Sequence, residues 1–201
     1  MSIRVLAIIA ASMCLACDTP EPGSVSGNVA APSDVFVQQP PVPGRVPPLH
    51  AGLGSNVIIG MFDNCDAETF NANIRPGACV RNGGMKFDQF IALLTRLGFV
   101  GPWHFSRPVA NARVGQTLVV TNHGGEDHTF TEVEEFGGGF VQNLNDLSGN
   151  PTPAPECLNL APGDFVAPGQ TFTEVEDEAG NEHYQCCIHP WMRLNLHVTE
   201  K

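Results

Sequence analysis

Residues 184–192 read Tyr-Gln-Cys-Cys-Ile-His-Pro-Trp-Met and place three metal-binding side chains within seven residues. Cys186 offers a thiolate, His189 an imidazole and Met192 a thioether, in the spacing Cys-x-x-His-x-x-Met. A copper ion that cycles between Cu(I) and Cu(II) typically takes two histidines and one cysteine in a plane, with a weak axial methionine. The segment therefore predicts a copper loop that lacks one histidine, and the fold must bring that histidine from elsewhere in the chain.

A second segment, residues 122–130, offers the missing histidine. The strand-like run at 116–122 ends in a turn, and His128 begins the next strand-like run. His128 completes a set of two imidazoles, one thiolate and one thioether. Zinc is the chemical alternative because cysteine and histidine also suit it, although zinc rarely takes a thioether.

With these residues the chain resembles the cupredoxins, the blue copper proteins of the plastocyanin, azurin and amicyanin type. The two-residue gap between His189 and Met192 resembles the amicyanin loop. The resemblance covers residues 103–201, about half of the chain. It implies one copper ion bound by His128, Cys186, His189 and, axially, Met192.

The other histidines compete less well for this site. His123 is an alternative ligand, but the spacing in the family favours His128. His183 lies three residues before Cys186 on an extended segment, which places it on the opposite face. The resemblance also implies that Asn122, six residues before His128, ties the two ligand-bearing loops together. The remaining histidines, expected to be structural or exposed, are His50, His104 and His197.

The chain has seven cysteines. Cys14 belongs to the N-terminal apolar segment, Cys17 is a lipidation candidate and Cys186 is the expected ligand. The other four form an even set, which in an oxidising compartment indicates two disulfides. Free buried thiols are the alternative. Among the possible pairings we favour Cys65–Cys79 and Cys157–Cys187.

Cys186 and Cys187 are adjacent, and strand alternation decides between them as ligands. Neighbouring side chains on an extended segment point to opposite faces, so one cysteine enters the site while the other points away. The spacing to His189 matches the family only from Cys186. Cys187 is then free to bridge Cys157.

Residues 1–17 contain one charge, Arg4, and an apolar run that is too short to span a bilayer. This pattern resembles a secretory signal peptide. Leu15-Ala16-Cys17 resembles the end of a bacterial lipobox, so we expect a lipid anchor on Cys17 that attaches the protein to a membrane. Plain cleavage is the alternative. We therefore expect an extracytoplasmic protein, in the bacterial periplasm or on the outer surface. Residues 18–48 are rich in proline and predict a disordered tether.

Residues 49–100 look ordered but lie outside the resemblance. Residues 56–62 predict a strand and residues 67–74 a short helix. Apolar residues recur at helical spacing from residue 87 to residue 97, and Gly98 stands where a C-terminal cap is expected. We interpret the region as an N-terminal extension with one clear helix, stapled by Cys65–Cys79 and packed against a copper domain at residues 101–201.

From residue 101 onward, short strand-like runs alternate with glycine, proline and asparagine. This pattern predicts several antiparallel strands and hence a β-sandwich. The fold class is therefore mainly β, a cupredoxin-like Greek-key β-sandwich with a partly helical N-terminal appendage. The insertion at 136–161 is long, and Cys157 is expected to tie it down. The clearest strands are expected at 118–122, 129–133, 171–175, 182–186 and 193–199.

Pro190 and Trp191 flank His189 and predict an apolar rim around an exposed imidazole edge. In the family, that edge is the route by which electrons reach a docked partner. Acidic residues outnumber basic ones 21 to 10, so nucleic acid is a poor partner and a basic redox protein is a better one.

The resemblance thus implies a monomeric type 1 copper protein that carries single electrons between partners such as a cytochrome or an oxidase. We expect an electron carrier and no enzyme, because the four ligands fill one mononuclear site and leave no place for a substrate. A module that delivers or buffers copper is the alternative function.

Overall fold

The computed structural model describes residues 56–201, which belong to one compact unit. The expected signal peptide at 1–17, the lipidation candidate Cys17 and the tether at 18–48 lie outside the described residues. Between residues 56 and 201, no helix has both the length and the apolar character needed to cross a membrane.

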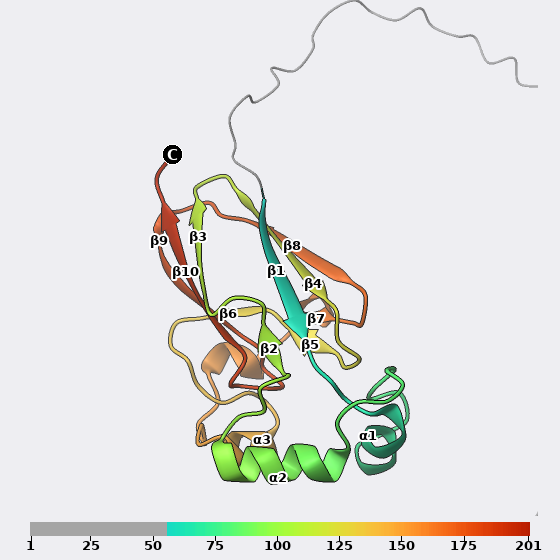
Figure 1. The fold of residues 1–201 in the computed structure, drawn as a ribbon. Helices are drawn as coiled ribbons and strands as arrows, with labels where there is room; N and C mark the ends of the chain where they lie inside the picture. The colour runs from blue at the N-terminus through green and yellow to red at the C-terminus, as the bar shows by residue number, and fades with distance from the viewer. Residues whose placement is uncertain (1–55) are drawn as a thin grey trace, which may run out of the picture. The chain divides into compact units, whose positions relative to one another are not determined.

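The described chain is built mainly from short strands (Figure 1). The helices are α1 (Ala67–Asn73), α2 (Phe87–Leu97) and α3 (Gln142–Leu147), with 3-10 turns at Pro155–Leu158 and Pro162–Asp164. The strands are β1 (Val57–Phe62), β2 (His104–Phe105), β3 (Val109–Arg113), β4 (Thr117–Asn122), β5 (His128–Thr129), β6 (Thr131–Val133), β7 (Phe165–Val166), β8 (Thr171–Val175), β9 (Gly180–Gln185) and β10 (Arg193–Thr199).

Two four-stranded sheets form the body of the molecule. One has the strand order β2-β1-β4-β8 and the other β3-β10-β9-β6, while β5 pairs with β7 beside them. Their inner faces share one hydrophobic core, to which β4 contributes Leu118 and Val120 and β10 contributes Leu194 and Leu196. Along β10 buried and exposed residues alternate, as the sequence predicts. The fold is therefore the mainly β sandwich that the sequence predicts.

The position of β1 differs from the expected division of the chain into an N-terminal extension, up to residue 100, and a separate copper domain. This strand lies inside the first sheet, between β2 and β4, and runs parallel to β4. β3 and β10 also pair in parallel, so the sheets are mixed instead of wholly antiparallel. The physical reason is that β1 buries Ile59 and Met61 completely, and β4 offers the hydrogen-bonding edge that this strand needs.

The helices α1 and α2 have the positions that the sequence predicts. The Asp66 side chain caps α1 by accepting a 3.0 Å hydrogen bond from the Thr69 N–H. α2 ends at Gly98, whose φ of 75° is in the left-handed region and whose N–H donates to the Leu94 carbonyl at 2.8 Å. Their apolar faces bury Phe70, Phe90 and Leu94 in the main core, so these helices are part of the sandwich domain's packing.

The disulfides are Cys65–Cys79 and Cys157–Cys187, the pairing that the sequence favours. The first connects the segment after β1 with the segment after α1. The second ties the insertion at 136–161, which contains α3, to the loop between β9 and β10. Cys186 is the free cysteine among the described residues, and it is buried.

Candidate metal centre

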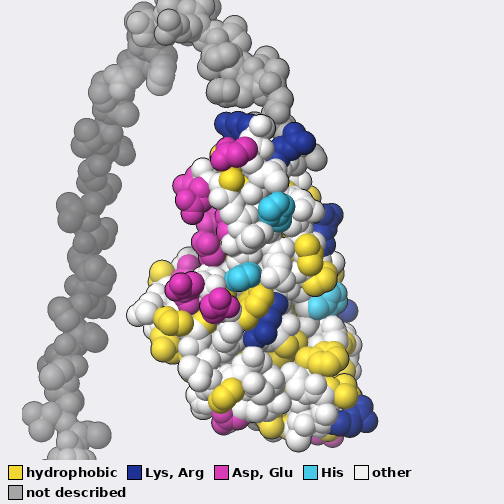
Figure 2. All heavy atoms as spheres, turned by 90° about the vertical axis from the view of Figure 1, so that its left-hand side faces the viewer, with side chains coloured by type: hydrophobic (Ala, Val, Ile, Leu, Met, Phe, Trp, Pro, Cys, Tyr) yellow, Lys and Arg dark blue, Asp and Glu magenta, His cyan; other side chains and the backbone are white. Residues whose placement is uncertain are grey.

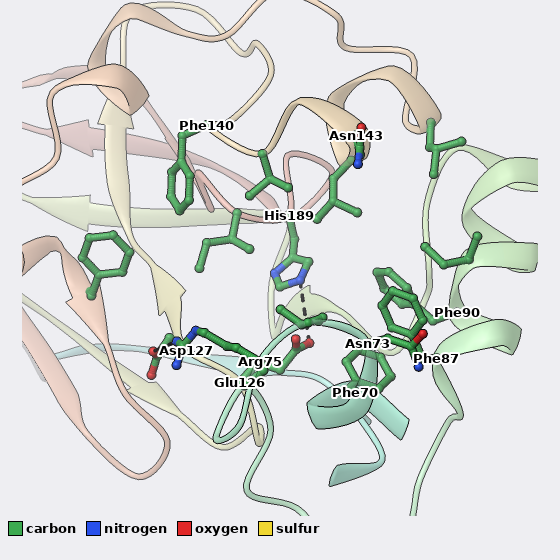
Figure 3. Close-up of a pocket in the computed structure, with 18 residues that line it drawn as sticks. Phe70, Asn73, Arg75, Phe87, Phe90, Glu126, Asp127, Phe140, Asn143 and His189 are labelled. Carbon is green, nitrogen blue, oxygen red and sulfur yellow. Dashed lines mark ion pairs between the residues drawn. The ribbon is translucent and has the colours of Figure 1, made fainter. Parts of the chain in front are cut away.

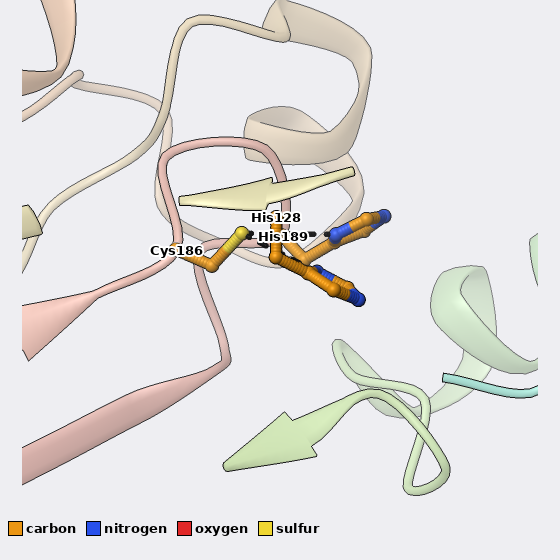
Figure 4. A group of neighbouring side chains, drawn as sticks. All are labelled: His128, Cys186 and His189. Atoms are coloured by element: carbon orange, nitrogen blue, oxygen red, sulfur yellow. Dashed lines mark hydrogen bonds between the residues drawn. The ribbon is translucent and has the colours of Figure 1, made fainter. Parts of the chain in front are cut away.

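His128, from β5, and Cys186 and His189, from the loop between β9 and β10, form a buried cluster (Figure 4). The Cys186 Sγ lies 3.7 Å from Nδ1 of His128 and 3.8 Å from Nδ1 of His189. Thiolate and imidazole ligands of one first-row metal ion lie about 3.6–3.8 Å apart when each bond is about 2.0–2.3 Å long. The three donor atoms are therefore spaced as ligands of a single ion, and their chemistry suits copper.

The loop between β9 and β10 is closed by its own backbone. The Cys186 N–H donates to the Met192 carbonyl at 3.0 Å, and the Met192 N–H donates to the His189 carbonyl at 2.9 Å. These bonds hold Cys186 and His189 on one side of a tight turn. Met192 is buried, and its role as an axial ligand stays a prediction.

Thr129 connects the two ligand-bearing segments. Its N–H donates to the Cys186 Sγ at 3.5 Å, and its hydroxyl accepts from the Cys187 N–H at 2.7 Å. The family resemblance implied that Asn122 would make this connection. The Asn122 side chain instead bonds to Gly124, Glu126 and the Val166 carbonyl, so it shapes the loop before His128.

Asp63, at the end of β1, lies directly behind His128. Its carboxylate accepts from His128 Nε2 at 3.0 Å and from the N–H groups of Gly125 and Glu126 at 2.8 and 3.0 Å. A carboxylate only accepts, so Nε2 carries the proton and Nδ1 faces Cys186. The Asp63 carboxylate lies so close to Gly124 that a Cβ there would collide with it. Burial alone would raise the pKa of Asp63, but the bonds from His128, Glu126 and Gly125 lower it to about 2.

The charges of the cluster reinforce one another. Burial disfavours an imidazolium, yet the Asp63 carboxylate and Cys186 raise the pKa of His128 to about 10. Burial also disfavours the Cys186 thiolate, but the hydrogen bonds and charges of both histidines hold the pKa of that thiol well below its usual range. The thiolate is the form that binds a metal, so the site is prepared for one.

Glu126 stands behind His189 in a comparable position. Its Oε2 is 3.7 Å from His189 Nε2 and accepts a 2.6 Å hydrogen bond from the Trp103 indole. Burial raises the pKa of Glu126, although His189 and Trp103 oppose this shift. A further group of Asp63, Cys65 and Glu126 lies close together, but Cys65 is disulfide-bonded and is no thiolate ligand.

The predicted exposed edge of His189 is wrong. His189 is only 2 % exposed, Pro190 is buried and Trp191 is half-buried. The rings of Phe90, Trp103 and Trp191 lie 6.4, 6.4 and 5.4 Å from the imidazole. Phe90 comes from α2, which the sequence predicts to pack against the copper domain, and it packs beside His189 and Trp191, the residues of the expected electron-transfer rim.

The other described histidines stay outside the cluster. His123 is exposed and stacks on Phe62 at 5.1 Å, and His104 stacks on the same ring at 5.2 Å. His183 is half-buried, and its ring hydrogen-bonds with the Glu134 carbonyl. His197 is exposed on β10. His50 lies outside the described residues.

Sequence reasoning missed the roles of Asp63 and Glu126. Two signals were present: Asp63 is an acidic residue at the end of an apolar strand, and Glu126 lies inside the segment that carries His128. Neither signal shows which histidine a carboxylate would reach.

Solved structures similar to this chain include cupredoxins. A purple cupredoxin from Nitrosopumilus maritimus is 16% identical, with a TM-score of 0.40, and the match covers 72% of this chain and 100% of that one. A P52G mutant of amicyanin is 21% identical, with a TM-score of 0.32, and covers 50% of this chain and 76% of its own. Protein-family models and curated protein sequences give no match. These similarities are low, so the metal assignment rests on the residues of the site.

Proposed function

We propose that this protein binds one copper ion through His128, Cys186 and His189, with Met192 as the axial ligand, and carries single electrons. The observation that carries the proposal is the buried Cys186 Sγ, which faces Nδ1 of both histidines at 3.7 and 3.8 Å. When bound, copper supplies a one-electron couple between Cu(I) and Cu(II).

The chain's own residues supply a fixed frame for that couple. Asp63 orients His128, Thr129 donates its N–H to the Cys186 Sγ, and the Met192 backbone closes the loop. Hydrogen bonds of this kind keep ligands in place when the charge of an ion changes. A small structural change between oxidation states supports fast electron transfer.

The burial of the donors favours a carrier over a copper-delivery module. Delivery to another protein requires an accessible ion, whereas His128 and Cys186 are 0 % exposed and His189 is 2 % exposed. The two disulfides fit an extracytoplasmic location, because such bonds persist in oxidising compartments. The proposed partner is a redox protein such as a cytochrome or an oxidase.

The acidic surface offers a way to attract a basic partner. Figure 2 shows acidic side chains gathered along one edge of the face that it draws. Burial and the nearby charges of Glu182 and Glu174 raise the pKa of Glu132, and burial and the charge of Glu182 raise the pKa of Glu174. The negative charge of this surface would speed association with a basic partner at low salt, and high salt would screen the effect.

The test is the visible absorption of the purified protein after addition of Cu(II). We expect an intense thiolate-to-copper band that Cys186→Ser abolishes and that His123→Ala, a histidine outside the cluster, leaves in place. A weak band that Cys186→Ser leaves unchanged would overturn the proposal. Rapid loss of the ion to a copper-free acceptor, without electron exchange, would instead support delivery.

A further inference from the structure

A pocket of about 660 Å³ opens beside the metal cluster. It lies between α1 and α2 on one side and the segment that contains α3 on the other (Figure 3). Its wall is mostly apolar, and His189 points into its centre. Five phenylalanines line it: Phe70, Phe87, Phe90, Phe140 and Phe165.

Glu126 is the buried polar group of this pocket. Its side chain is 9 % exposed and lies just below the His189 imidazole in Figure 3. Oε2 is engaged by Trp103 and His189, whereas Oε1 makes no hydrogen bond or ion pair with any residue between 56 and 201. Oε1 is accessible within the pocket, so a bound molecule that carries a donor can form a hydrogen bond with it.

The other charges of the pocket lie at its edge. Arg75 and Asp127 form a 3.6 Å ion pair with side chains that are 63% and 41% exposed. Because these two side chains pair with each other at the edge, the interior of the pocket contains one carboxylate, that of Glu126, and a wall rich in aromatic rings. An anionic ligand would be repelled by Glu126 and by the protein's net charge of −11.

We propose that this pocket binds a small, uncharged aromatic molecule whose single hydroxyl group donates a hydrogen bond to Glu126 Oε1. The volume falls in the range of small-molecule sites, about 300–1,000 Å³. Phenyl rings favour flat aromatic ligands in stacked or edge-to-face contact. A bound molecule would contact the imidazole of His189, the proposed copper ligand that lines the pocket.

The test compares two probes of equal size on the metal-free protein, so that its result does not depend on copper binding. 2-Naphthol carries the hydroxyl donor, and 2-methylnaphthalene carries a methyl group in its place. Binding is followed by the change in probe fluorescence. We expect 2-naphthol to bind about tenfold to a hundredfold more tightly, because a hydrogen bond to a charged group contributes that much.

Two variants separate the donor contact from the apolar wall. Glu126→Gln should reduce the preference for 2-naphthol, since a neutral amide accepts a weaker hydrogen bond. Leu144→Trp, on the pocket wall, should weaken both probes, while Leu158→Trp, an exposed leucine that does not line the pocket, should change neither.

Two results would overturn the proposal. Equal affinity for the two probes would remove the role of Glu126, and failure of both probes to bind would remove the site. Circular dichroism of each variant shows whether a loss of binding reflects the pocket or a loss of fold.

Discussion

His128 and His189 each have a carboxylate behind Nε2, yet the two carboxylates are held in different ways. Asp63 directly follows the inner strand β1 and lies 3.0 Å from His128. Its carboxylate accepts from three backbone N–H groups, those of Cys65, Gly125 and Glu126. Glu126 lies 3.7 Å from His189 and turns one oxygen toward a pocket. The first arrangement is part of the core, and the second is open to small molecules.

The two histidines of the metal cluster therefore have different roles. The His128 side fixes geometry, because moving Asp63 would disturb both β1 and the loop before His128. The His189 side can respond to a ligand, because its cover consists of side chains from α2 and the segment around Trp191. Variants on each side can therefore test whether the two roles are truly separate.

The largest effect is expected from Asp63→Asn. Removing one partner of a buried ion pair destabilises a protein by about 3–5 kcal/mol. Loss of such a support behind a metal ligand also lowers metal affinity by about 10–100-fold. Urea unfolding of the metal-free protein and a copper competition titration measure the two effects. Asp127→Asn, at the exposed edge of the pocket, is the control, and equal results for both variants would contradict a special role for Asp63.

The double variant Cys157→Ser with Cys187→Ser should have the next largest effect. Its disulfide closes a sequence separation of 30, so its loss should lower the free energy of unfolding by about 3–4 kcal/mol. Because it anchors the loop that carries both Cys186 and His189, the thiolate-to-copper band should broaden. Thermal unfolding and absorption measure this. A protein that unfolds at the same temperature would show that the insertion is held by packing alone.

Glu126→Gln should have a smaller effect on stability than Asp63→Asn. The 3.7 Å ion pair is long, and the amide oxygen still accepts from Trp103, so we expect a loss of about 1–2 kcal/mol. Copper affinity should fall less than it does in Asp63→Asn. The same unfolding and competition measurements apply. A larger loss than in Asp63→Asn would reverse the comparison between the two histidines.

Glu176→Gln should leave both histidines unchanged and alter only the pH dependence of stability. Burial, a hydrogen bond that protonated Glu176 donates to Glu182, and nearby carboxylates raise the pKa of Glu176 from 4.5 to about 8. The folded state therefore holds this proton more tightly than the unfolded state, so stability falls as pH rises from 4.5 to about 8. Between these pH values, the melting temperature of the variant should fall less than that of the unaltered protein. An unchanged pH profile would show that Glu176 is ionised at low pH in the folded protein.

The parts of the site that the sequence predicts are those set by local pattern. Cys186 and His189 lie on one tight loop, and the adjacent Cys187 on the same loop bridges Cys157, so short-range geometry decides their placement. Gly98 ends α2 for an equally local reason. Four remaining cysteines allow three sets of pairings, and the structure has the set that the sequence favours.

The parts that could not be predicted depend on contacts between distant residues. Asp63 and His128 are 65 positions apart, and no periodicity links them. The apolar stripe of α2 predicts burial, but the stripe does not indicate that Phe90 would pack near His189. The parallel pairing of β1 with β4 also depends on the path of the helices between them.

The parallel pairing of β1 with β4 has a consequence for the order in which this protein forms. The Asp63 carboxylate reaches His128 only after the helical crossover has been completed, and Cys186 follows His128 by a further 58 positions. Contacts between such distant segments are slow to form. A chain that has been synthesised only as far as His128 therefore holds no complete metal site. A tightly bound ion would show that the segments carrying Asp63, His128 and Cys186 have packed together.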